Sequence, residues 1–334
     1  MAKNEKFFFD NDADLAPMQD KTIAVIGYGN QGRSQALNMA DNGLKVIVGG
    51  QRDATLKQAQ DDGFETMSVT EAAGKADAVL LLVPDEIMPQ VYNEQVAPHM
   101  QAGQMVSFAS GYNVYYGFIK PAEDLDVILL APRMIGQGVR ERFVNGQGYP
   151  ALIAVHQDGS GQAMPRLLAL AKGIGATKMG ALDSSFEEET ILDLFNEQAM
   201  CGVQLWAFRT AFDVLTGYGL NPSAILLELY ASGEPEQIAK AYTELGIWDQ
   251  LKLHSRTSQF GQLTRARLGA GPELKKHMGK IVDELKDGSF AREWATEQNV
   301  GFPGLTRMHR EVAAHESYKA EKRLYEMMKN KKED

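Results

Sequence analysis

The chain has 334 residues, and at about 150 residues per domain this length predicts two domains. Hydrophobic residues make up 44% of it and charged residues 23%, which is typical of a globular protein and excludes a disordered or fibrous chain. Lys and Arg number 34 against 44 Asp and Glu, and the resulting net charge of −10 argues against nucleic acid or an acidic membrane surface as a partner. The one cysteine, Cys201, cannot form an intrachain disulfide, so we expect a reducing, cytoplasmic location.

The apolar runs of the sequence are short. Residues 7–9 are three phenylalanines followed at once by acidic residues, which is too short for a signal peptide. The longest later run, residues 78–84, is far below the ~20 residues that span a bilayer. We therefore expect neither export by a visible signal nor insertion into a membrane.

The first half of the chain alternates short apolar runs with helical patterns. Residues 31–42 are typical of a helix closed by Gly43, and residues 78–83 of a strand buried on both faces. The candidate strands are residues 22–26, 45–48, 78–83, 105–109, 126–131 and 151–156. This alternation predicts an α/β fold, with a mostly parallel sheet covered by helices on both faces.

The pattern changes near residue 182. Beyond it the chain has long helical periodicities and no convincing strand, with helix starts predicted at residues 184–188 and at Asn221-Pro222. We predict a sheet domain over residues 1–182 and an all-helical domain over residues 183–334.

A glycine-rich motif follows the first candidate strand and opens the predicted helix. It reads Gly27-Tyr28-Gly29-Asn30-Gln31-Gly32, which is the G-x-G-x-x-G spacing. Glycines at this spacing permit a sharp turn and a close approach to a pyrophosphate, and the helix amino terminus supplies N–H donors. The motif predicts a Rossmann-type domain in which these six residues bind a dinucleotide; a glycine-rich turn without a ligand is the alternative.

The residues after the second candidate strand bear on the choice of dinucleotide. An NAD-binding unit usually has an acid at the end of this strand, where it binds the ribose 2′-hydroxyl. Here the strand ends in glycines, followed by Arg52 and, as a nearby hydroxyl donor, Thr55. We predict NADPH in preference to NADH, with Arg52 and Thr55 at the 2′-phosphate. Asp53 would oppose that phosphate if it pointed inward, and Arg52 is alternatively a solvated loop residue.

Three carboxylates recur at intervals of four residues in the predicted helix after residue 184. Glu189, Asp193 and Glu197 therefore share one helical face, with apolar neighbours around it. Like charges at this spacing repel, and a hard divalent cation such as Mg²⁺ would turn that repulsion into binding. The alternative is an acidic first turn that matches the helix dipole, which accounts for Glu189 but poorly for Glu197.

Glu228 is a second candidate. It lies in residues 224–230, a segment that is apolar nearly all round, so we expect its carboxylate to be buried. A buried carboxylate without a partner is costly, so Glu228 is expected to have a cationic partner, a metal ion or a raised pKa.

Over nearly its whole length the chain resembles the ketol-acid reductoisomerases in their shorter form. The resemblance is carried by FFFDNDADL, KTIAVIGYGNQGRSQALNMADNG, LLVPDEI, DVILLAPR, PALIAVHQD, FEEETILDLFNEQ and DGSFAREW. It implies an amino-terminal domain that binds a nicotinamide cofactor and a knotted, helical carboxyl-terminal domain that forms a homodimer or a higher homo-oligomer. It also implies two Mg²⁺ ions, an alkyl shift in a 2-hydroxy-3-keto acid and hydride reduction of the resulting 2-keto acid.

The resemblance assigns roles to four residues of this chain. Asp193 matches the bridging metal ligand of the family, and Glu197 matches a ligand of the first metal ion. Glu228 matches a ligand of the second metal ion, donated by the partner subunit. Ser255 matches the serine that binds the substrate carboxylate.

Three positions depart from the family pattern. Ser110 stands in place of a catalytic histidine, Arg133 in place of a catalytic lysine, and Ser232 in place of a second metal-binding glutamate. Serine cannot act as an imidazole acid or base, and arginine cannot give up a proton. These changes predict a diverged member, an NAD(P)H-dependent oxidoreductase that reduces a small 2-keto acid or a related carbonyl or imine, with the isomerase step lost or altered.

Two alternatives stay open. One is a genuine ketol-acid reductoisomerase that converts 2-acetolactate to 2,3-dihydroxy-isovalerate in valine and isoleucine biosynthesis. The other is a catalytically silent homologue that binds nucleotide, and the joint presence of Asp193, Glu197, Glu228 and Ser255 argues against it.

Overall fold

The computed structural model describes residues 5–266, 269 and 271–329. The chain forms two compact units that divide between Leu192 and Asp193. This division falls later than the boundary predicted at residue 182, because the first turns of helix α9 (Phe186–Phe195) belong to the first unit. Phe186 is part of a buried apolar cluster of that unit, and Glu189 is fully buried.

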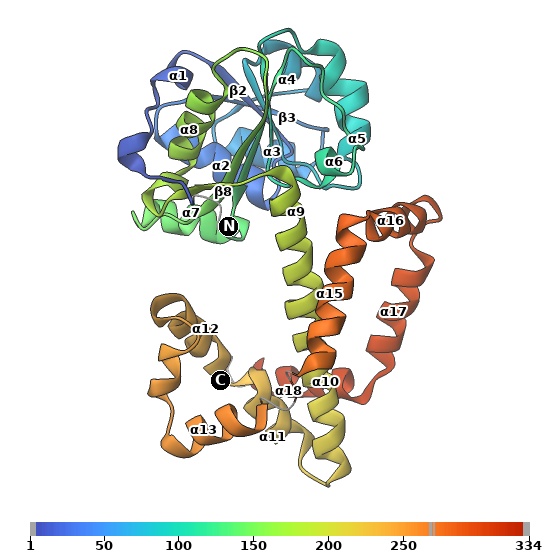
Figure 1. The fold of residues 1–334 in the computed structure, drawn as a ribbon. Coiled ribbons are helices and arrows are strands. Elements are labelled where there is room, and N and C mark those ends of the chain that lie inside the picture. The colour runs from blue at the N-terminus through green and yellow to red at the C-terminus, as the bar shows by residue number, and fades with distance from the viewer. Residues whose placement is uncertain (1–4, 267–268, 270, 330–334) are drawn as a thin grey trace. The chain divides into compact units, whose positions relative to one another are not determined.

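The first unit is built on a nine-stranded sheet, counted among the described residues, in the order β1-β9-β8-β7-β6-β5-β2-β3-β4. Figure 1 shows this sheet with helices on both sides of it. The strands are β1 (Phe7–Phe8), β2 (Thr22–Ile26), β3 (Lys45–Gly49), β4 (Glu65–Met67), β5 (Ala78–Leu81), β6 (Met105–Phe108), β7 (Asp126–Pro132), β8 (Ala151–Asp158) and β9 (Ala181–Asp183). Neighbouring strands pair in parallel, except that β7–β8 and β1–β9 are antiparallel. The predicted mostly parallel sheet is confirmed, and each candidate run forms a strand.

Strands β1, β4 and β9 have no clear signal in the sequence. They are two or three residues long and are stabilised by their neighbours: Phe7 lies opposite Leu182, and Glu65 lies beside Ile47. Strands this short depend on pairing and burial rather than on their own propensity, so alternation along the chain cannot reveal them.

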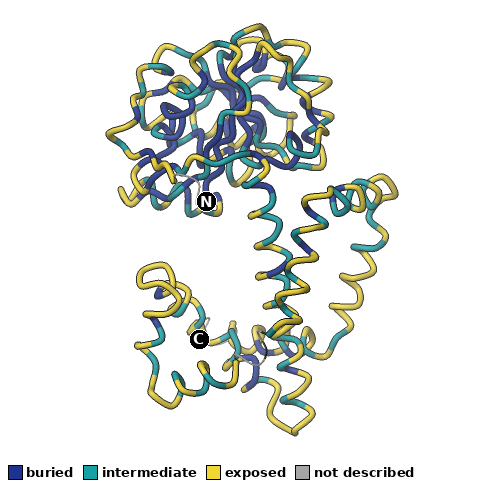
Figure 2. The backbone as a smooth tube through the Cα atoms, in the orientation of Figure 1, coloured by how far each residue is buried: buried dark blue, intermediate teal, exposed yellow. Residues whose placement is uncertain are grey.

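Helices cover both faces of the sheet and enclose two apolar cores, which appear as the dark blue interior in Figure 2. Buried side chains of α1, α2, α3, α7 and α8 form one core, and those of α4, α5, α6 and the start of α9 form the other. The helices are α1 (Ala16–Gln19), α2 (Asn30–Asp41), α3 (Ala54–Asp61), α4 (Val69–Lys75), α5 (Met88–Val91), α6 (Tyr112–Tyr115), α7 (Gly136–Val144) and α8 (Ala163–Ile174), with short turns η1 (Asp10–Asp12), η2 (Tyr92–Val96), η3 (Ala97–His99) and η4 (Ala176–Lys178).

The strand order positions the candidate site. From β2 the chain moves outward through β3 and β4, then returns to β5 on the other side of β2. Ligands of open α/β sheets bind outside the carboxyl ends of the strands at such a reversal. The glycine-rich turn follows β2, Arg52 follows β3, Ser110 follows β6 and Arg133 follows β7, so all of them lie at this edge.

The second unit is entirely helical over the residues that the structure describes, as predicted. After the end of α9 it contains α10 (Gly202–Gly217), α11 (Pro222–Leu226), α12 (Glu234–Leu245), α13 (Arg256–Gly261), α15 (Pro272–Lys286), α16 (Ser289–Asn299), α17 (Pro303–Ala314) and α18 (Glu316–Lys329), and turns η5 (Asn196–Cys201), η6 (Leu227–Ala231), η7 (Asp249–Leu253) and η8 (Gln262–Ala266). Helix α11 begins where predicted, with Asn221 Oδ1 accepting the N–H groups of Ser223 and Ala224. Within the described residues, no helix is long and apolar enough to cross a membrane.

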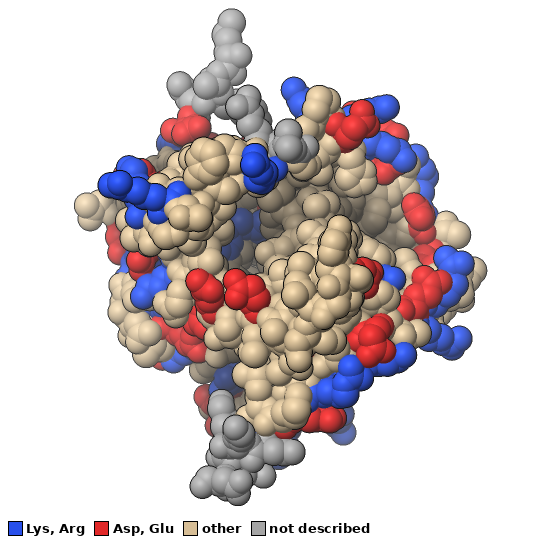
Figure 3. All heavy atoms as spheres, turned by 90° about the horizontal axis from the view of Figure 1, so that it is seen from below, with Lys and Arg blue, Asp and Glu red and all other residues tan. Residues whose placement is uncertain are grey.

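The core of the second unit is small. Its buried cluster consists of Phe212, Ile225, Leu226, Ala320 and Leu324, whereas much of its remaining tube in Figure 2 is yellow. Large apolar side chains stay in contact with solvent in the single chain; Trp206 is 59% exposed and Trp248 is 71% exposed. On the face drawn in Figure 3, acidic and basic side chains are interspersed among uncharged surface.

Candidate active site

The three glycines of the G-x-G-x-x-G turn are needed for different reasons. Gly27 has φ +95°, and a Cβ there would lie 2.8 Å from the carbonyl oxygen of Leu82. A Cβ on Gly32 would lie 1.9 Å from the carbonyl oxygen of Gly27, so both positions are restricted by the protein's own packing. A Cβ on Gly29 would meet no atom within 4 Å among the described residues. The space above Gly29, where α2 begins, is therefore available to a ligand.

We expect Gly29→Ala to fold normally but to bind a dinucleotide about tenfold more weakly, because the added methyl group occupies the space left for the pyrophosphate. Gly32→Ala is the matched control: it should lower the unfolding temperature because its methyl group meets backbone. Thermal unfolding and fluorescence titration with NADPH measure the two effects. Unchanged NADPH affinity in Gly29→Ala would contradict a ligand at this turn.

Two side chains of the turn serve the protein's own structure. Tyr28 is 5% exposed and its hydroxyl donates to Asp62 at 2.8 Å. Gln31 donates through Nε2 to the carbonyl oxygen of Met134 at 2.9 Å, which ties the turn to the segment after β7. Asn30 is exposed as the first residue of α2. Any pyrophosphate contact of the turn is therefore expected from backbone N–H groups rather than from Tyr28 or Gln31.

A cavity of about 650 Å³ lies beyond the ends of β3 and β4, and exposed Arg52 lines it. Asp53 is turned toward its own helix: its Oδ1 accepts the N–H groups of Thr55 and Leu56 at 2.9 and 3.1 Å. The hydroxyl of Thr55 donates to the same oxygen at 2.7 Å, so its hydrogen is used in the helix cap and not offered to a phosphate. These contacts, the Thr55 hydroxyl first, hold the pKa of Asp53 below its usual value.

Arg133 and Glu189 form an ion pair at the same edge of the sheet. Arg133 Nη2 donates to Glu189 Oε1 at 2.8 Å, and the second oxygen of Glu189 accepts the N–H of Gly111 at 2.7 Å. The Glu189 side chain is fully buried, while 30% of the Arg133 side chain is exposed. Neighbouring Ser110 is half-buried, and its hydroxyl accepts the N–H of Tyr112 at 3.3 Å.

Sequence reasoning grouped Glu189 with Asp193 and Glu197 on one helical face but did not predict its contacts with Arg133 and Gly111. Its one signal was the spacing of four residues before Asp193. The structure shows that α9 approaches Gly111 too closely for any other residue, because a Cβ there would lie 2.4 Å from the carbonyl oxygen of Phe186. Glu189 therefore connects the loop that carries Ser110 with the one that carries Arg133.

Asp193 and Glu197 stand four residues apart at the start of the second unit. Glu197 lies in η5, a π-helical turn, and such turns are frequent at functional sites. Burial and the nearby charge of Asp193 raise the pKa of Glu197. Two oxygen ligands that repel each other fit a hard cation such as Mg²⁺. Among the described residues, however, no third acidic, histidine or cysteine side chain joins them.

The remaining predicted site residues, Glu228, Ser232 and Ser255, come from other helical segments of the second unit. Glu228 is exposed, so the expectation of a buried carboxylate is wrong: α11 and η6 bury Ile225 and Leu226, while even Leu227 is 37% exposed. Exposed Ser232 accepts the N–H of Glu234 at 3.4 Å. Ser255 is also exposed and caps α13 by accepting the N–H of Ser258 at 3.2 Å.

Both units of the chain match models of known protein families. Residues 17–180 match the acetohydroxy acid isomeroreductase NADPH-binding domain, and residues 186–330 match the ketol-acid reductoisomerase C-terminal domain. The chain belongs to the ketol-acid reductoisomerase family. This confirms the resemblance seen in the sequence, and it makes the protein an NAD(P)H-dependent oxidoreductase by family.

Individual relatives match over nearly the whole chain. A Saccharolobus solfataricus protein with the provisional name ketol-acid reductoisomerase 3 is 46% identical over 97% of this chain and 98% of its own length. The ketol-acid reductoisomerase (NADP(+)) of Methanocaldococcus jannaschii is 41% identical over 98% of this chain and 99% of its own. The structure of an NADH-preferring ketol-acid reductoisomerase from an uncultured archaeon superimposes with a TM-score of 0.91, at 34% identity, covering 96% of this chain and 98% of that one.

These relatives bear on the expected loss of the isomerase step. They carry the name of the complete reductoisomerase at 41% and 34% identity, so the comparisons do not support a reductase without isomerase activity. They favour the alternative, a genuine reductoisomerase.

Proposed function

We propose that this protein is a ketol-acid reductoisomerase that converts 2-acetolactate to 2,3-dihydroxy-isovalerate in valine and isoleucine biosynthesis. The observation that carries the proposal is the full-length identity of 41% to the Methanocaldococcus jannaschii enzyme. The open space at Gly29 and the carboxylate pair of Asp193 and Glu197 support it, because the reaction needs a dinucleotide and a divalent cation.

Each group of residues has a separate task in this proposal. Backbone N–H groups of the glycine-rich turn bind the cofactor pyrophosphate. Asp193 and Glu197 hold Mg²⁺, with Glu228 supplied by the partner subunit of a dimer, as the family resemblance implies. When bound, Mg²⁺ polarises the oxygens of the substrate as a Lewis acid. Ser110 offers a hydroxyl to the substrate, Ser255 binds its carboxylate, and Arg133, held by Glu189, keeps a fixed positive charge at this edge.

A second candidate function is reduction of a 2-keto acid without isomerisation. The identities of Arg133 and Ser110 favour it, because a guanidinium cannot release a proton and a serine hydroxyl cannot act as an imidazole acid or base. Steady-state assays with 2-acetolactate and 3-hydroxypyruvate, both with NADPH and Mg²⁺, separate the candidates. Comparable turnover of the two substrates supports the reductoisomerase, whereas a preference for 3-hydroxypyruvate of about 100-fold or more supports the second candidate. In that case Ser110→His, Arg133→Lys and Ser232→Glu together should raise turnover of 2-acetolactate.

We further propose NADPH as the preferred dinucleotide, with Arg52 at the 2′-phosphate. Arg52→Ala should weaken NADPH binding about tenfold and NADH binding little, because only NADPH carries the charge that Arg52 faces. Lys57→Ala is the matched control, since Lys57 lines the same cavity but already pairs with Asp61 at 2.9 Å. Dissociation constants for both dinucleotides test this, and equal losses in Arg52→Ala would contradict it.

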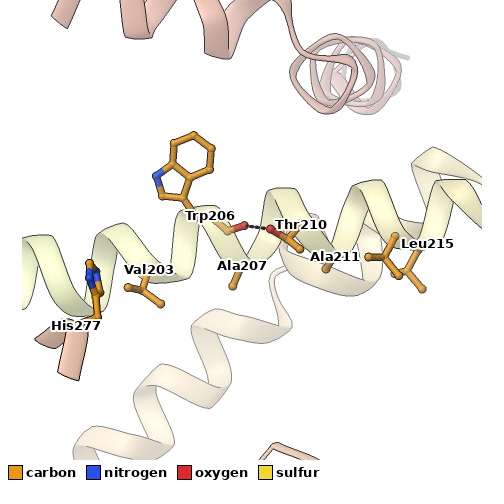
Figure 4. Close-up of a pocket in the computed structure, with 8 residues that line it drawn as sticks. Val203, Trp206, Ala207, Thr210, Ala211, Leu215 and His277 are labelled. Atoms are coloured by element: carbon orange, nitrogen blue, oxygen red, sulfur yellow. Dashed lines mark hydrogen bonds between the residues drawn. The ribbon is translucent and has the colours of Figure 1, made fainter. Parts of the chain in front are cut away.

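The second unit supplies a surface for the proposed homodimer. An apolar groove runs along α10 between Val203 and Leu215, with His277 of α15 at one end (Figure 4). The Trp206 ring projects away from the ribbon in that view and is 59% exposed. We propose that a second copy of the chain covers this face. The knotted path and the cytoplasmic location stay predictions.

A further inference from the structure

The hydroxyl of Tyr28 ties the glycine-rich turn to a distant part of the first unit. Tyr28 follows Gly27 in the turn, but its ring packs edge-on against Phe64 with 5.8 Å between centroids. Its hydroxyl donates to Asp62, which is 34 residues away in the chain, at the carboxyl end of α3. Beside the hydrogen bond from Gln31 to Met134, the turn therefore has a second anchor outside its own strand and helix.

Asp62 accepts hydrogen bonds from two further side chains. Arg33 of α2 donates through Nε at 2.7 Å and Nη2 at 3.0 Å, and Gln58 donates at 3.2 Å. A carboxylate at a helix carboxyl end opposes the helix dipole, so it needs such donors. The hydrogen bonds from Arg33 hold the pKa of Asp62 below its usual value. The pKa of the Tyr28 hydroxyl is raised, mainly by burial and next by its hydrogen bond to Asp62. Tyr28 thus keeps its proton and donates to an ionised acceptor.

The two ends of α3 border different parts of the dinucleotide site. Its carboxyl end, at Asp62, holds the turn assigned to the pyrophosphate. Its amino end, capped by Asp53, lies beside Arg52 in the cavity assigned to the ribose. A helix of eight residues is about 12 Å long, so α3 acts as a rigid spacer between the two parts.

We propose that Tyr28, Arg33 and Asp62, here called the Asp62 cluster, position the glycine-rich turn relative to the ribose cavity and so raise the affinity for an intact dinucleotide. The inference rests on the proposed function, because it concerns that function's cofactor. Without the cluster the turn adopts additional positions, and only the fraction of molecules in the correct position binds both halves of the ligand. The apparent dissociation constant rises in inverse proportion to that fraction.

The test compares intact dinucleotide with a fragment. Tyr28→Phe removes one oxygen atom and should raise the dissociation constant of NADPH about fivefold, and Asp62→Asn about tenfold. Adenosine 2′-monophosphate occupies only the ribose cavity, so both variants should bind it within about twofold of the wild type. The double variant should lose less than the product of the single losses, because both changes remove the same contact.

Tyr149→Phe is the matched control. Tyr149 is fully buried and its hydroxyl donates to the carbonyl oxygen of Ile174, remote from the turn in the chain. This variant should lower the unfolding temperature without changing NADPH affinity.

Three results would overturn the inference. They are unchanged NADPH binding in Tyr28→Phe and Asp62→Asn, an equal loss for NADPH and adenosine 2′-monophosphate, and an NADPH loss in Tyr149→Phe that matches that of Tyr28→Phe. A wild-type protein that binds neither NADPH nor NADH would instead overturn the proposed function.

Discussion

Asp193→Asn is expected to lower turnover at least 1000-fold while leaving NADPH affinity within about twofold of the wild type. Asp193 and Glu197 are the two carboxylates that fit Mg²⁺, and the change replaces an anionic ligand by a neutral amide. The residue lies beyond the sheet unit that carries the glycine-rich turn, so cofactor binding is a separate readout. A steady-state assay with 2-acetolactate, NADPH and Mg²⁺ measures turnover. Fluorescence titration with NADPH measures cofactor affinity, and calorimetric titration with Mg²⁺ measures metal affinity.

Glu244→Gln serves as the control for Asp193→Asn, since Glu244 is an exposed carboxylate that pairs with Lys240 on α12. It should behave as the wild type in both titrations. Because the pKa of Glu197 is raised, protons compete with the metal ion, and Mg²⁺ affinity should fall as the pH is lowered through that pKa. An Asp193→Asn variant that turns over at a normal rate without added metal would show that the pair is not the metal site.

Glu189→Gln is expected to destabilise the first unit by about 2 kcal/mol, which corresponds to a fall of roughly 6 °C in Tm. The carboxylate is fully buried and accepts from Arg133 and from the N–H of Gly111. An amide retains one accepting oxygen but places an N–H₂ group against the other donor, and it removes the charge that faces Arg133. This loss of about 2 kcal/mol is smaller than the usual cost of breaking a buried ion pair, because 30% of the Arg133 side chain is exposed.

Thermal unfolding monitored by circular dichroism checks this prediction. Arg133→Lys should cost less than Glu189→Gln, because lysine keeps the charge and one hydrogen bond to the carboxylate. The control Glu65→Gln affects a pair that is mostly exposed, with Lys75 at 3.2 Å, and should change Tm by at most about 1 °C. A Glu189→Gln variant as stable as Glu65→Gln would mean that the ion pair with Arg133 contributes nothing to the fold.

Local pattern in the sequence determined the elements around the glycine-rich turn. The candidate strand at residues 22–26 is strand β2, and the helix predicted from residue 31 begins at Asn30. Asn221 also caps α11 as predicted. These features depend on groups within a few residues of one another: a short run of apolar residues, a glycine that permits φ +95° and a side chain that caps its own helix. Signals of this kind can be recognised in a short segment without knowing how the rest of the chain folds.

Only the tertiary structure decided which distant side chains meet. Arg133 and Glu189 are 56 residues apart, and no spacing rule connects a residue after β7 with one in α9. Glu228 was expected to be buried because its neighbours in sequence are apolar. Burial depends, however, on which helix face packs against the core, and that face holds Ile225 and Leu226.

Tyr28 is a further case. The motif predicted that it binds the ligand, but its hydroxyl donates a hydrogen bond to Asp62 at the end of another helix. Contacts of this kind form only when separate elements pack together, so the pattern of neighbouring residues in the sequence cannot predict them.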